Sequence, residues 1–268
     1  QMEEIVDAVT LCPPNDFAAV RHALAGGEIA ALILEPTGPH FGTVPIEAGF
    51  LETLREETRK AGAVLIFDEV SCGFRIAVGG AQEYLGVTPD MTVLAKAMSN
   101  GYAMGAVVGS RHVMEPASRM FISSSYWADN IGLTSSITTI RELKRRDSPT
   151  RFREIGENIR AAVKEAIADV GISADVVGLS KSPALVIDLP DESLRPKVMT
   201  LFIQEMARRG VHCHTSFNPT LAHTEEDIRR TAEAAEESFR IIQRGLEGEL
   251  DELLVADEKK EPFRRLVR

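Results

Sequence analysis

Residues 63–70 read Ala-Val-Leu-Ile-Phe-Asp-Glu-Val, an apolar run that ends abruptly in two acids. Such a short, unbroken run is typical of a strand buried on both faces, as in a parallel sheet. Similar runs occupy residues 29–34 and 91–94, and residues 46–60 carry apolar side chains at helical spacing. Strand–helix–strand units of this kind predict a mainly parallel α/β sheet, in which ligands bind at the carboxyl ends of the strands.

The second half of the sequence has a different pattern. Short apolar stretches near residue 176 and at 184–189 indicate strands, and we expect residues 211–214 to form another. Thr224 and Asp227 have the spacing of a capping box. These features predict a smaller α+β domain after a boundary near residues 145–150. Helices are predicted over residues 16–24, 46–60, 133–146, 152–170, 194–209 and 225–246.

Composition narrows the class of protein. The 268 residues include 40 acidic and 30 basic side chains, a formal net charge of −10, which argues against a duplex nucleic acid as partner. No run approaches the roughly 18 apolar residues of a membrane span. Three cysteines, Cys12, Cys72 and Cys213, are scattered and odd in number. We expect reduced thiols in a cytoplasmic protein.

Polar residues follow three of the predicted strands. Glu35 follows the first, Asp68 ends the second, and Lys96 comes two residues after the third. Taken singly, each acid is as well explained by a helix cap or a structural ion pair, and the lysine by a solvated surface position. The carboxyl ends of parallel strands share one edge of the sheet, so the three side chains are expected to converge there. That convergence favours a functional site.

The motifs around these residues, taken in order, resemble those of class III aminotransferases, and most closely the branch of glutamate-1-semialdehyde aminomutases. The resemblance implies fold type I and dependence on pyridoxal phosphate. It makes residues 1–147 the C-terminal part of the cofactor-binding large domain and residues 148–268 the small C-terminal α+β domain. The motifs are Leu34-Glu35-Pro36, Gly49-Phe50-Leu51, Phe67-Asp68-Glu69-Val70, Gly73-Phe74-Arg75, Pro89-Asp90, Leu94-Ala95-Lys96 and Leu221-Ala222-His223-Thr224.

The resemblance assigns roles that these residue types can perform. Lys96 matches the lysine that forms a Schiff base with the cofactor aldehyde and then moves the substrate proton. Asp68 matches the carboxylate that keeps the pyridine nitrogen protonated. Val70 is expected to pack on the ring, Ser71 to approach the ring hydroxyl, and Glu35 to lie on the substrate side.

A serine-rich stretch matches the family's phosphate contact. Ser125 aligns with a threonine that reaches the cofactor phosphate of the neighbouring subunit, and a serine hydroxyl can donate to phosphate in the same way. The alternative is a plain polar turn. A contact across the subunit boundary implies a homodimer with active sites at the interface.

Two departures from the family pattern bear on the reaction. The aminomutase branch carries a substrate-facing glutamate where Thr215 stands here, with Asn218 nearby. A neutral lining favours intermolecular aminotransfer, between an amine or amino acid and a carbonyl acceptor, over the alternative of an intramolecular 2,1-aminomutase. The family's upstream phosphate cradle has no counterpart in these residues. A non-catalytic half that needs a complementary N-terminal chain is therefore a further alternative.

Two other classes of site are weaker alternatives. His212 and His214 flank Cys213, which suggests a metal, but such histidines more often pack or form hydrogen bonds, and we expect no metal site. The Gly101–Gly105 loop lacks the dinucleotide fingerprint of a nicotinamide enzyme.

Overall fold

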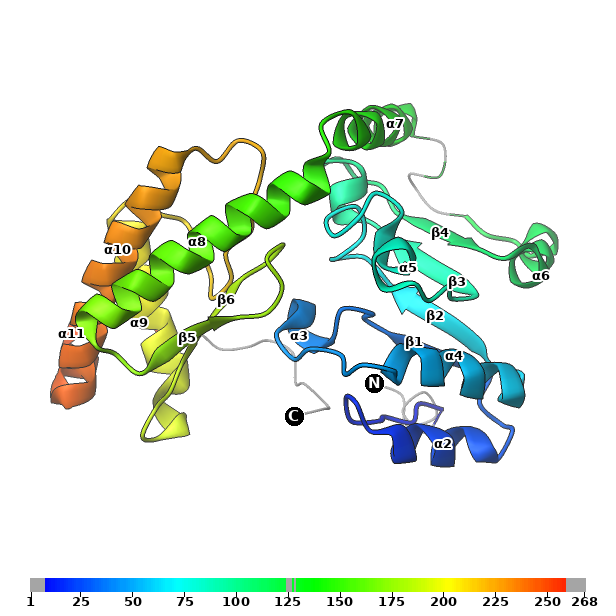
Figure 1. Ribbon diagram of the computed structural model, residues 1–268, viewed down its shortest axis with the longest axis horizontal. Helices are drawn as coiled ribbons and strands as arrows, with labels where there is room; N and C mark the ends of the chain where they lie inside the picture. The colour runs from blue at the N-terminus through cyan, green and yellow to red at the C-terminus, as the bar shows by residue number, and fades with distance from the viewer. Residues whose placement is uncertain (1–7, 124–126, 128, 259–268) are drawn as a thin grey trace. The chain divides into compact units, whose positions relative to one another are not determined.

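The computed structural model describes residues 8–123, 127 and 129–258 (Figure 1). The chain forms two compact units, one ending at Thr150 and the other beginning at Arg151. Each unit contains its own cluster of buried hydrophobic side chains.

The first unit contains the strands β1 (Ala31–Leu34), β2 (Val64–Asp68), β3 (Met91–Leu94) and β4 (Ala106–Gly109). They form one sheet in the order β1-β2-β3-β4. The first three are parallel, with Leu34 opposite Phe67 and Asp68 opposite Val93, and β4 is antiparallel to β3. The prediction of a mainly parallel α/β sheet is confirmed.

Helices of the first unit lie before, between and after these strands. Asp16 caps the first of them, because its carboxylate accepts a hydrogen bond from the N–H of Ala19. The helix predicted from residue 46 begins later, after Gly49 at φ +80°. Phe17 and Phe50 pack edge to face with ring centroids 5.0 Å apart. The helices are α2 (Phe17–Ala25), α3 (Pro39–Gly42), α4 (Phe50–Ala61), α5 (Gly80–Leu85), α6 (Arg111–Met114) and α7 (Asn130–Arg145), with 3₁₀ turns at Lys96–Met98 and Glu115–Arg119.

Burial differs between the two predicted inner strands. Leu65 and Phe67 of β2 are completely buried, as expected for a strand with neighbours on both sides. The expectation that residues 29–34 are buried on both faces is wrong, since Ile33 is 61% exposed. Within the described residues β1 pairs with β2 alone, so it is an edge strand.

The second unit packs helices against a hairpin. β5 (Ala174–Val177) and β6 (Ala184–Ile187) are antiparallel. The helices are α8 (Ser148–Val170), α9 (Arg195–Arg208), α10 (Glu225–Arg244) and α11 (Leu250–Leu253), with a 3₁₀ turn at Glu192–Leu194 and a π turn at Gly245–Glu249. Only Arg146 and Asp147 separate α8 from α7, and Asp147 adopts φ +49°, so the break is shorter than predicted.

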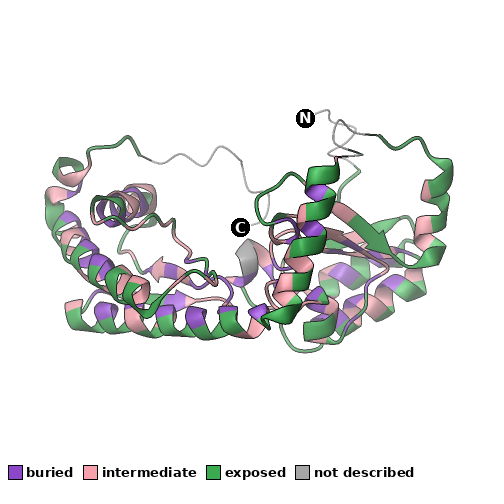
Figure 2. Cartoon of the chain, turned by 90° about the horizontal axis from the view of Figure 1, so that it is seen from above, coloured by how far each residue is buried: buried purple, intermediate pink, exposed green. Residues whose placement is uncertain are grey.

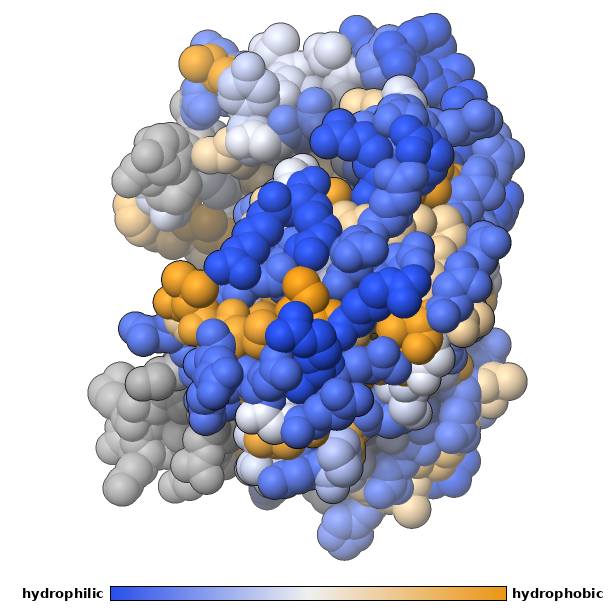
Figure 3. Space-filling view, turned by 90° about the vertical axis from the view of Figure 1, so that its left-hand side faces the viewer, coloured by the Kyte–Doolittle hydropathy of each residue, from blue (hydrophilic) through white to orange (hydrophobic). Residues whose placement is uncertain are grey.

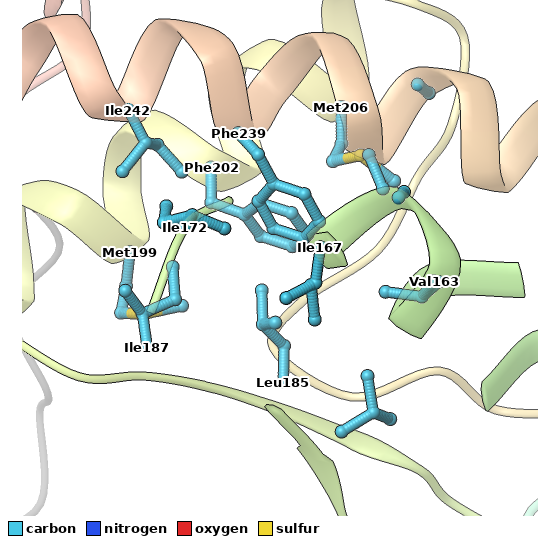
Figure 4. Close-up of a cluster of buried hydrophobic side chains, with 14 of the residues drawn as sticks. Val163, Ile167, Ile172, Leu185, Ile187, Met199, Phe202, Met206, Phe239 and Ile242 are labelled. Carbon is cyan, nitrogen blue, oxygen red and sulfur yellow. The ribbon is translucent and has the colours of Figure 1, made fainter. Parts of the chain in front are cut away.

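Aromatic stacking marks the centre of the second unit. The rings of Phe202 and Phe239 lie 5.8 Å apart at 14° to each other, and neither side chain is exposed. Figure 4 shows them among aliphatic side chains such as Ile242 and Leu185. Buried residues recur along one side of each long helix in Figure 2, as an amphipathic pattern requires.

The predicted start of α10 is confirmed, and a predicted strand before it is not. Thr224 and Asp227 form a reciprocal capping box at the start of α10. Residues 211–214 form no strand. The chain instead pairs with β6 just afterwards, where the N–H of Leu185 donates to the carbonyl of Thr215 and Ala184 bridges to Ser216.

The surface of the second unit is rich in charge. On α10, Arg229 pairs with Glu226 and Glu233 at the spacing of successive helical turns. Hydrophilic residues make up most of the face drawn in Figure 3, with hydrophobic residues gathered in a band across its middle. Among the described residues, no helix combines the length and the apolar character needed to cross a membrane.

Candidate active site

Three strand ends of the first unit share one edge of its sheet. Asp68 is the last residue of β2, Glu35 directly follows β1, and Lys96 follows β3 after one intervening residue. The three strands are parallel, so their carboxyl ends lie on the same side. The two acids and the lysine therefore end or follow strands whose carboxyl ends share one edge of the sheet.

Lys96 has an unusual backbone. It adopts φ +46°, in the left-handed region that costs a non-glycine residue about 1–2 kcal/mol. Ala95 before it is extended, so the chain turns sharply at the strand end. The Lys96 side chain is exposed, and its Nζ donates to Ser71 Oγ over 2.6 Å. Strained residues of this kind concentrate at functional sites, which supports a role for Lys96.

The loop after Lys96 is fixed by serines and by α7. The buried Ser99 hydroxyl donates to the carbonyl of Tyr102, and Ser135 of α7 donates to the carbonyl of Ser99 over 2.7 Å. A Cβ at Gly132 of α7 would lie 2.7 Å from the carbonyl oxygen of Ala103. Only glycine permits this close approach, so α7 holds the loop in place behind the lysine.

Asp68 presents its carboxylate at the end of β2. Its Oδ1 accepts a hydrogen bond from the N–H of Val70 at 3.0 Å, which is its one hydrogen bond within the described part of the chain. Asp68, Val70 and Ser71 are all half-buried. A carboxylate held by one local bond keeps lone pairs available for a ligand.

Glu69 is a buried acid that the sequence analysis did not single out. Its side chain is 1% exposed, and its Oε2 accepts the N–H of Ala81 at 2.6 Å. Burial raises the pKa of Glu69, and the hydrogen bond from Ala81 only partly opposes this. Side chains alternate along a strand, so a second acid directly after Asp68 had to point to the other face. Gly80, which packs on the Glu69 carboxyl group, was the available signal in the sequence.

Glu35 lies in a tight turn after β1. Thr37 Oγ1 donates to Glu35 Oε1 at 3.3 Å, and Thr37 is itself buried. Gly38 adopts φ +97°, and a Cβ there would lie 2.0 Å from the carbonyl oxygen of Val44. The turn therefore fixes the position of Glu35 at the sheet edge.

The remaining predicted site residues fall elsewhere. Ser125 lies outside the described residues. Thr215 and Asn218 belong to the second unit, where Thr215 Oγ1 lies 3.2 Å from His214 Nδ1 and Asn218 Oδ1 accepts from the Ser182 hydroxyl at 3.3 Å. Phe217 between them is buried in the core of that unit.

The His-Cys-His stretch has little of the character of a metal site. Burial raises the pKa of Cys213 to about 11, which keeps the thiol protonated at neutral pH. Within the described ranges no three His, Cys, Asp or Glu side chains cluster as metal ligands.

The sequence matches the family described as aminotransferase class-III over residues 4–244. It is 33% identical over 245 residues to the glutamate-1-semialdehyde 2,1-aminomutase 2 of Brevibacillus brevis, covering 85% of this chain and 57% of that protein. It is 30% identical over 239 residues to the 3-aminobutyryl-CoA aminotransferase of Cloacimonas acidaminovorans, covering 87% of this chain and 58% of that protein.

The fold has counterparts among solved structures. A transaminase with PLP bound superposes with a TM-score of 0.84 at 26% identity, over 92% of this chain and 60% of that one. The chain thus spans somewhat more than half the length of the curated relatives that it matches.

Proposed function

The chain belongs to the class III aminotransferase family, and from this premise we propose that it acts in pyridoxal-phosphate-dependent transfer of an amino group. The donor is an amine or amino acid and the acceptor is a carbonyl compound. The observation that carries the proposal is the placement of Asp68 and Lys96 at the carboxyl ends of adjacent parallel strands.

The donor set at this edge suits pyridoxal phosphate. A primary amine is required to hold its aldehyde, and Lys96 supplies an exposed amine on a short, fixed turn. A carboxylate is required at its pyridine nitrogen, and Asp68 supplies one with a single local hydrogen bond. When bound, the cofactor supplies an electron sink for the substrate carbon that bears the amino group.

Each residue then has a defined task. Asp68 would hold the pyridine nitrogen of the cofactor in its protonated form. Lys96 would hold the cofactor through Nζ and, with its amine free, would carry a proton to and from the substrate carbon. Ser71 orients the Lys96 amine through the 2.6 Å hydrogen bond. The resemblance assigns Val70 and Ser71 to the ring of the cofactor.

We propose that the amino group is transferred between two molecules, rather than moved within one molecule as in a 2,1-aminomutase. The family resemblance assigns Glu35, Thr215 and Asn218 to the substrate side. Thr215 and Asn218 carry no charge, so they hold a less polar substrate that enters, donates nitrogen and leaves. Relatives of both kinds match the chain, and a 2,1-aminomutase is the alternative within the same chemistry.

The proposal extends to assembly and location. Ser125 lies outside the described residues, and its proposed part in binding the cofactor phosphate of a neighbouring subunit comes from the family resemblance; on that ground we propose a homodimer as the active unit. We also propose a cytoplasmic location, because the three cysteines are odd in number and scattered along the sequence.

A second candidate is a half-enzyme that binds a complementary chain. The outer edge of β1 pairs with no described strand. Beside it lies an apolar cavity of about 800 Å³, lined by β1, by residues 8–14 and by the buried side of α2. Val9 and Ile33 are 58% and 61% exposed there.

Borohydride reduction in the presence of pyridoxal phosphate tests the main proposal. Peptide mapping is expected to find the label on Lys96. A label on another lysine, with Lys96 unmodified, removes the assignment. The isolated chain, scanned for the absorbance of the bound cofactor, separates the two candidates, because a half-enzyme gains that absorbance only with its complement.

A further inference from the structure

Glu69 ties together two ends of the loop that carries the proposed cofactor contacts. Its backbone N–H donates to the carbonyl of Val93 on β3 at 2.9 Å, and its carbonyl accepts from Gly73 at 2.9 Å. Its Oε2 accepts from Ala81, twelve residues further along the chain, at 2.6 Å. One buried residue is therefore bonded to the neighbouring strand, to the start of the loop and to the first turn of α5.

The contact between Glu69 and the start of α5 is too close to admit a side chain at Gly80. Gly80 adopts φ +77°, and a Cβ there would lie 2.4 Å from Glu69 Oε2 and 2.9 Å from Oε1. The Gly80 backbone thus packs directly on the carboxyl group. A Cβ at Gly73 would lie 2.8 Å from Leu94 Cδ2, so the start of the loop is packed as closely against β3.

The second carboxyl oxygen of Glu69 has no hydrogen-bond donor among the described residues. Glu69 Oε1 is fully buried and accepts no hydrogen bond from any residue that the structure describes. A buried carboxylate oxygen without a donor is costly, which favours the neutral carboxyl form. The raised pKa of Glu69, caused by burial, agrees with this. A glutamine side chain would keep the same shape and the same acceptor toward Ala81.

Val70 and Ser71 lie in the loop between Glu69, directly after β2, and Ala81, in the first turn of α5. Ser71 is two residues beyond Glu69, and its hydroxyl receives the amine of Lys96. The position of that hydroxyl relative to β3 depends on where the loop leaves β2 and where it is anchored at α5. Both points are set by Glu69.

We propose that Glu69 is a positioning residue of this site: its buried carboxyl group holds the loop from β2 to α5 so that Ser71 stays within hydrogen-bond distance of the Lys96 amine. The inference rests on the proposed function, since it deepens the account of the same site. Glu69 touches no reacting atom and acts only through Ser71.

The test uses the complete encoded protein with pyridoxal phosphate as the probe. Glu69→Ala removes the acceptor for Ala81, whereas Glu69→Gln retains it. We expect Glu69→Ala to weaken cofactor binding about fivefold, the same loss as removal of the Ser71 hydroxyl, and Glu69→Gln to restore affinity to within twofold of the parent. Amide exchange at Ala81 is expected to rise in Glu69→Ala and not in Glu69→Gln.

A matched control variant and a double-mutant cycle distinguish a positioning role of Glu69 from a general effect on the stability of the protein. Glu83 Oε2 accepts the N–H of Gly79 at 2.5 Å in the same loop, but Glu83 is exposed. Glu83→Ala is expected to change cofactor affinity by less than twofold. In a double-mutant cycle, Ser71→Ala is expected to weaken binding in the parent and to add little in Glu69→Ala, because the contact is already lost.

The outcomes are distinct. Additive effects of Glu69→Ala and Ser71→Ala, or affinity unchanged in Glu69→Ala, overturn the positioning role. Parent protein that never acquires the absorbance of the bound cofactor overturns the proposed function instead. If Glu69→Ala does not fold, Glu69→Asp replaces it, since the shorter side chain keeps the carboxyl group but cannot reach Ala81.

Discussion

The amine of Lys96 donates to the hydroxyl of Ser71 over 2.6 Å, and this bond links the turn after β3 to the loop after β2. The two strands are neighbours in the sheet, so the link spans the edge where Asp68 also lies. Lys96 reaches it from a left-handed backbone conformation, which aims a long, flexible side chain in one direction. The lysine is therefore preorganised rather than free to sample the solvent.

Removing the Ser71 hydroxyl tests the value of this link. Ser71→Ala leaves the fold intact and is expected to weaken pyridoxal phosphate binding about fivefold, because a net hydrogen bond is worth about 1 kcal/mol. Absorbance titration of the bound cofactor measures the change, with Ser118→Ala, an exposed serine that bonds only within its own turn, as control. Equal affinities of Ser71→Ala and the parent would show that Ser71 does not orient Lys96.

Asp68→Asn tests the carboxylate at the pyridine nitrogen. An amide cannot hold that nitrogen protonated, so the cofactor loses its capacity as an electron sink while its other contacts remain. We expect weaker but measurable cofactor binding and turnover reduced by two to four powers of ten, since electrostatic contributions of this kind are worth about 3–5 kcal/mol. Turnover within tenfold of the parent, at equal cofactor content, contradicts the role.

The sequence predicted the elements that are decided by local pattern. Residues 91–94 form β3 with the expected bounds, and Thr224 caps α10, because strand runs and capping boxes are read from neighbouring residues. The burial of residues 29–34 was misjudged, because exposure depends on what lies beside a strand and not on its own sequence. Ile33 has the composition of an inner strand and the surroundings of an edge.

The candidate site likewise contains residues that the sequence reveals and residues that it does not. Glu35, Asp68 and Lys96 follow from strand ends, which sequence reveals. Glu69 does not, because its role depends on the backbone of Gly80, eleven residues away, and on a hydrogen bond that no periodicity encodes. The anchoring of the lysine loop by Ser135 of α7 is hidden for the same reason.

Asp90 gives a prediction about stability. It follows Pro89 in a motif that the family shares, and its carboxylate joins Arg55 of α4, at 2.9 Å, to the N–H of Leu65 on β2, at 2.8 Å. Burial works to raise the pKa of Asp90, but the hydrogen bonds from Arg55 and Leu65 outweigh it and lower the pKa below its ordinary value. A carboxyl group with a pKa lowered on folding stabilises the fold above its unfolded pKa, and this is lost as the pH falls through the folded pKa.

Asp90→Asn is therefore expected to reduce the free energy of unfolding by about 2 kcal/mol at pH 7. The difference from the parent shrinks as the pH falls below about 4, the ordinary pKa of an aspartate, and is lost as the pH passes through the lower pKa of folded Asp90. Urea unfolding at several pH values measures both effects. Asp175→Asn is the control: Asp175 pairs with Lys164 at 2.7 Å, but both side chains are about half exposed, so a loss below 1 kcal/mol is expected. Equal reductions of the free energy of unfolding in both variants would show that Asp90 stabilises the fold no more than an exposed ion pair does.

The choice between aminotransferase and aminomutase rests on the second unit. A mutase must retain its intermediate while nitrogen moves between two carbons, so its pocket requires groups that fix both ends of a small substrate. The family resemblance aligns Thr215 with a glutamate of the aminomutase branch. The backbone carbonyl of Thr215 accepts from the N–H of Leu185, and Asn218 Oδ1 accepts from the Ser182 hydroxyl. With no charge at these positions, we expect glutamate-1-semialdehyde to be converted poorly by the complete enzyme, at least a hundredfold more slowly than amino transfer from a good donor to an added acceptor.

The assay follows 5-aminolevulinate from glutamate-1-semialdehyde with no acceptor present. Thr215→Glu serves as the matched variant and is expected to gain mutase turnover. Efficient formation of 5-aminolevulinate by the unaltered enzyme would make the protein a mutase, with the second charge supplied by a residue other than Thr215.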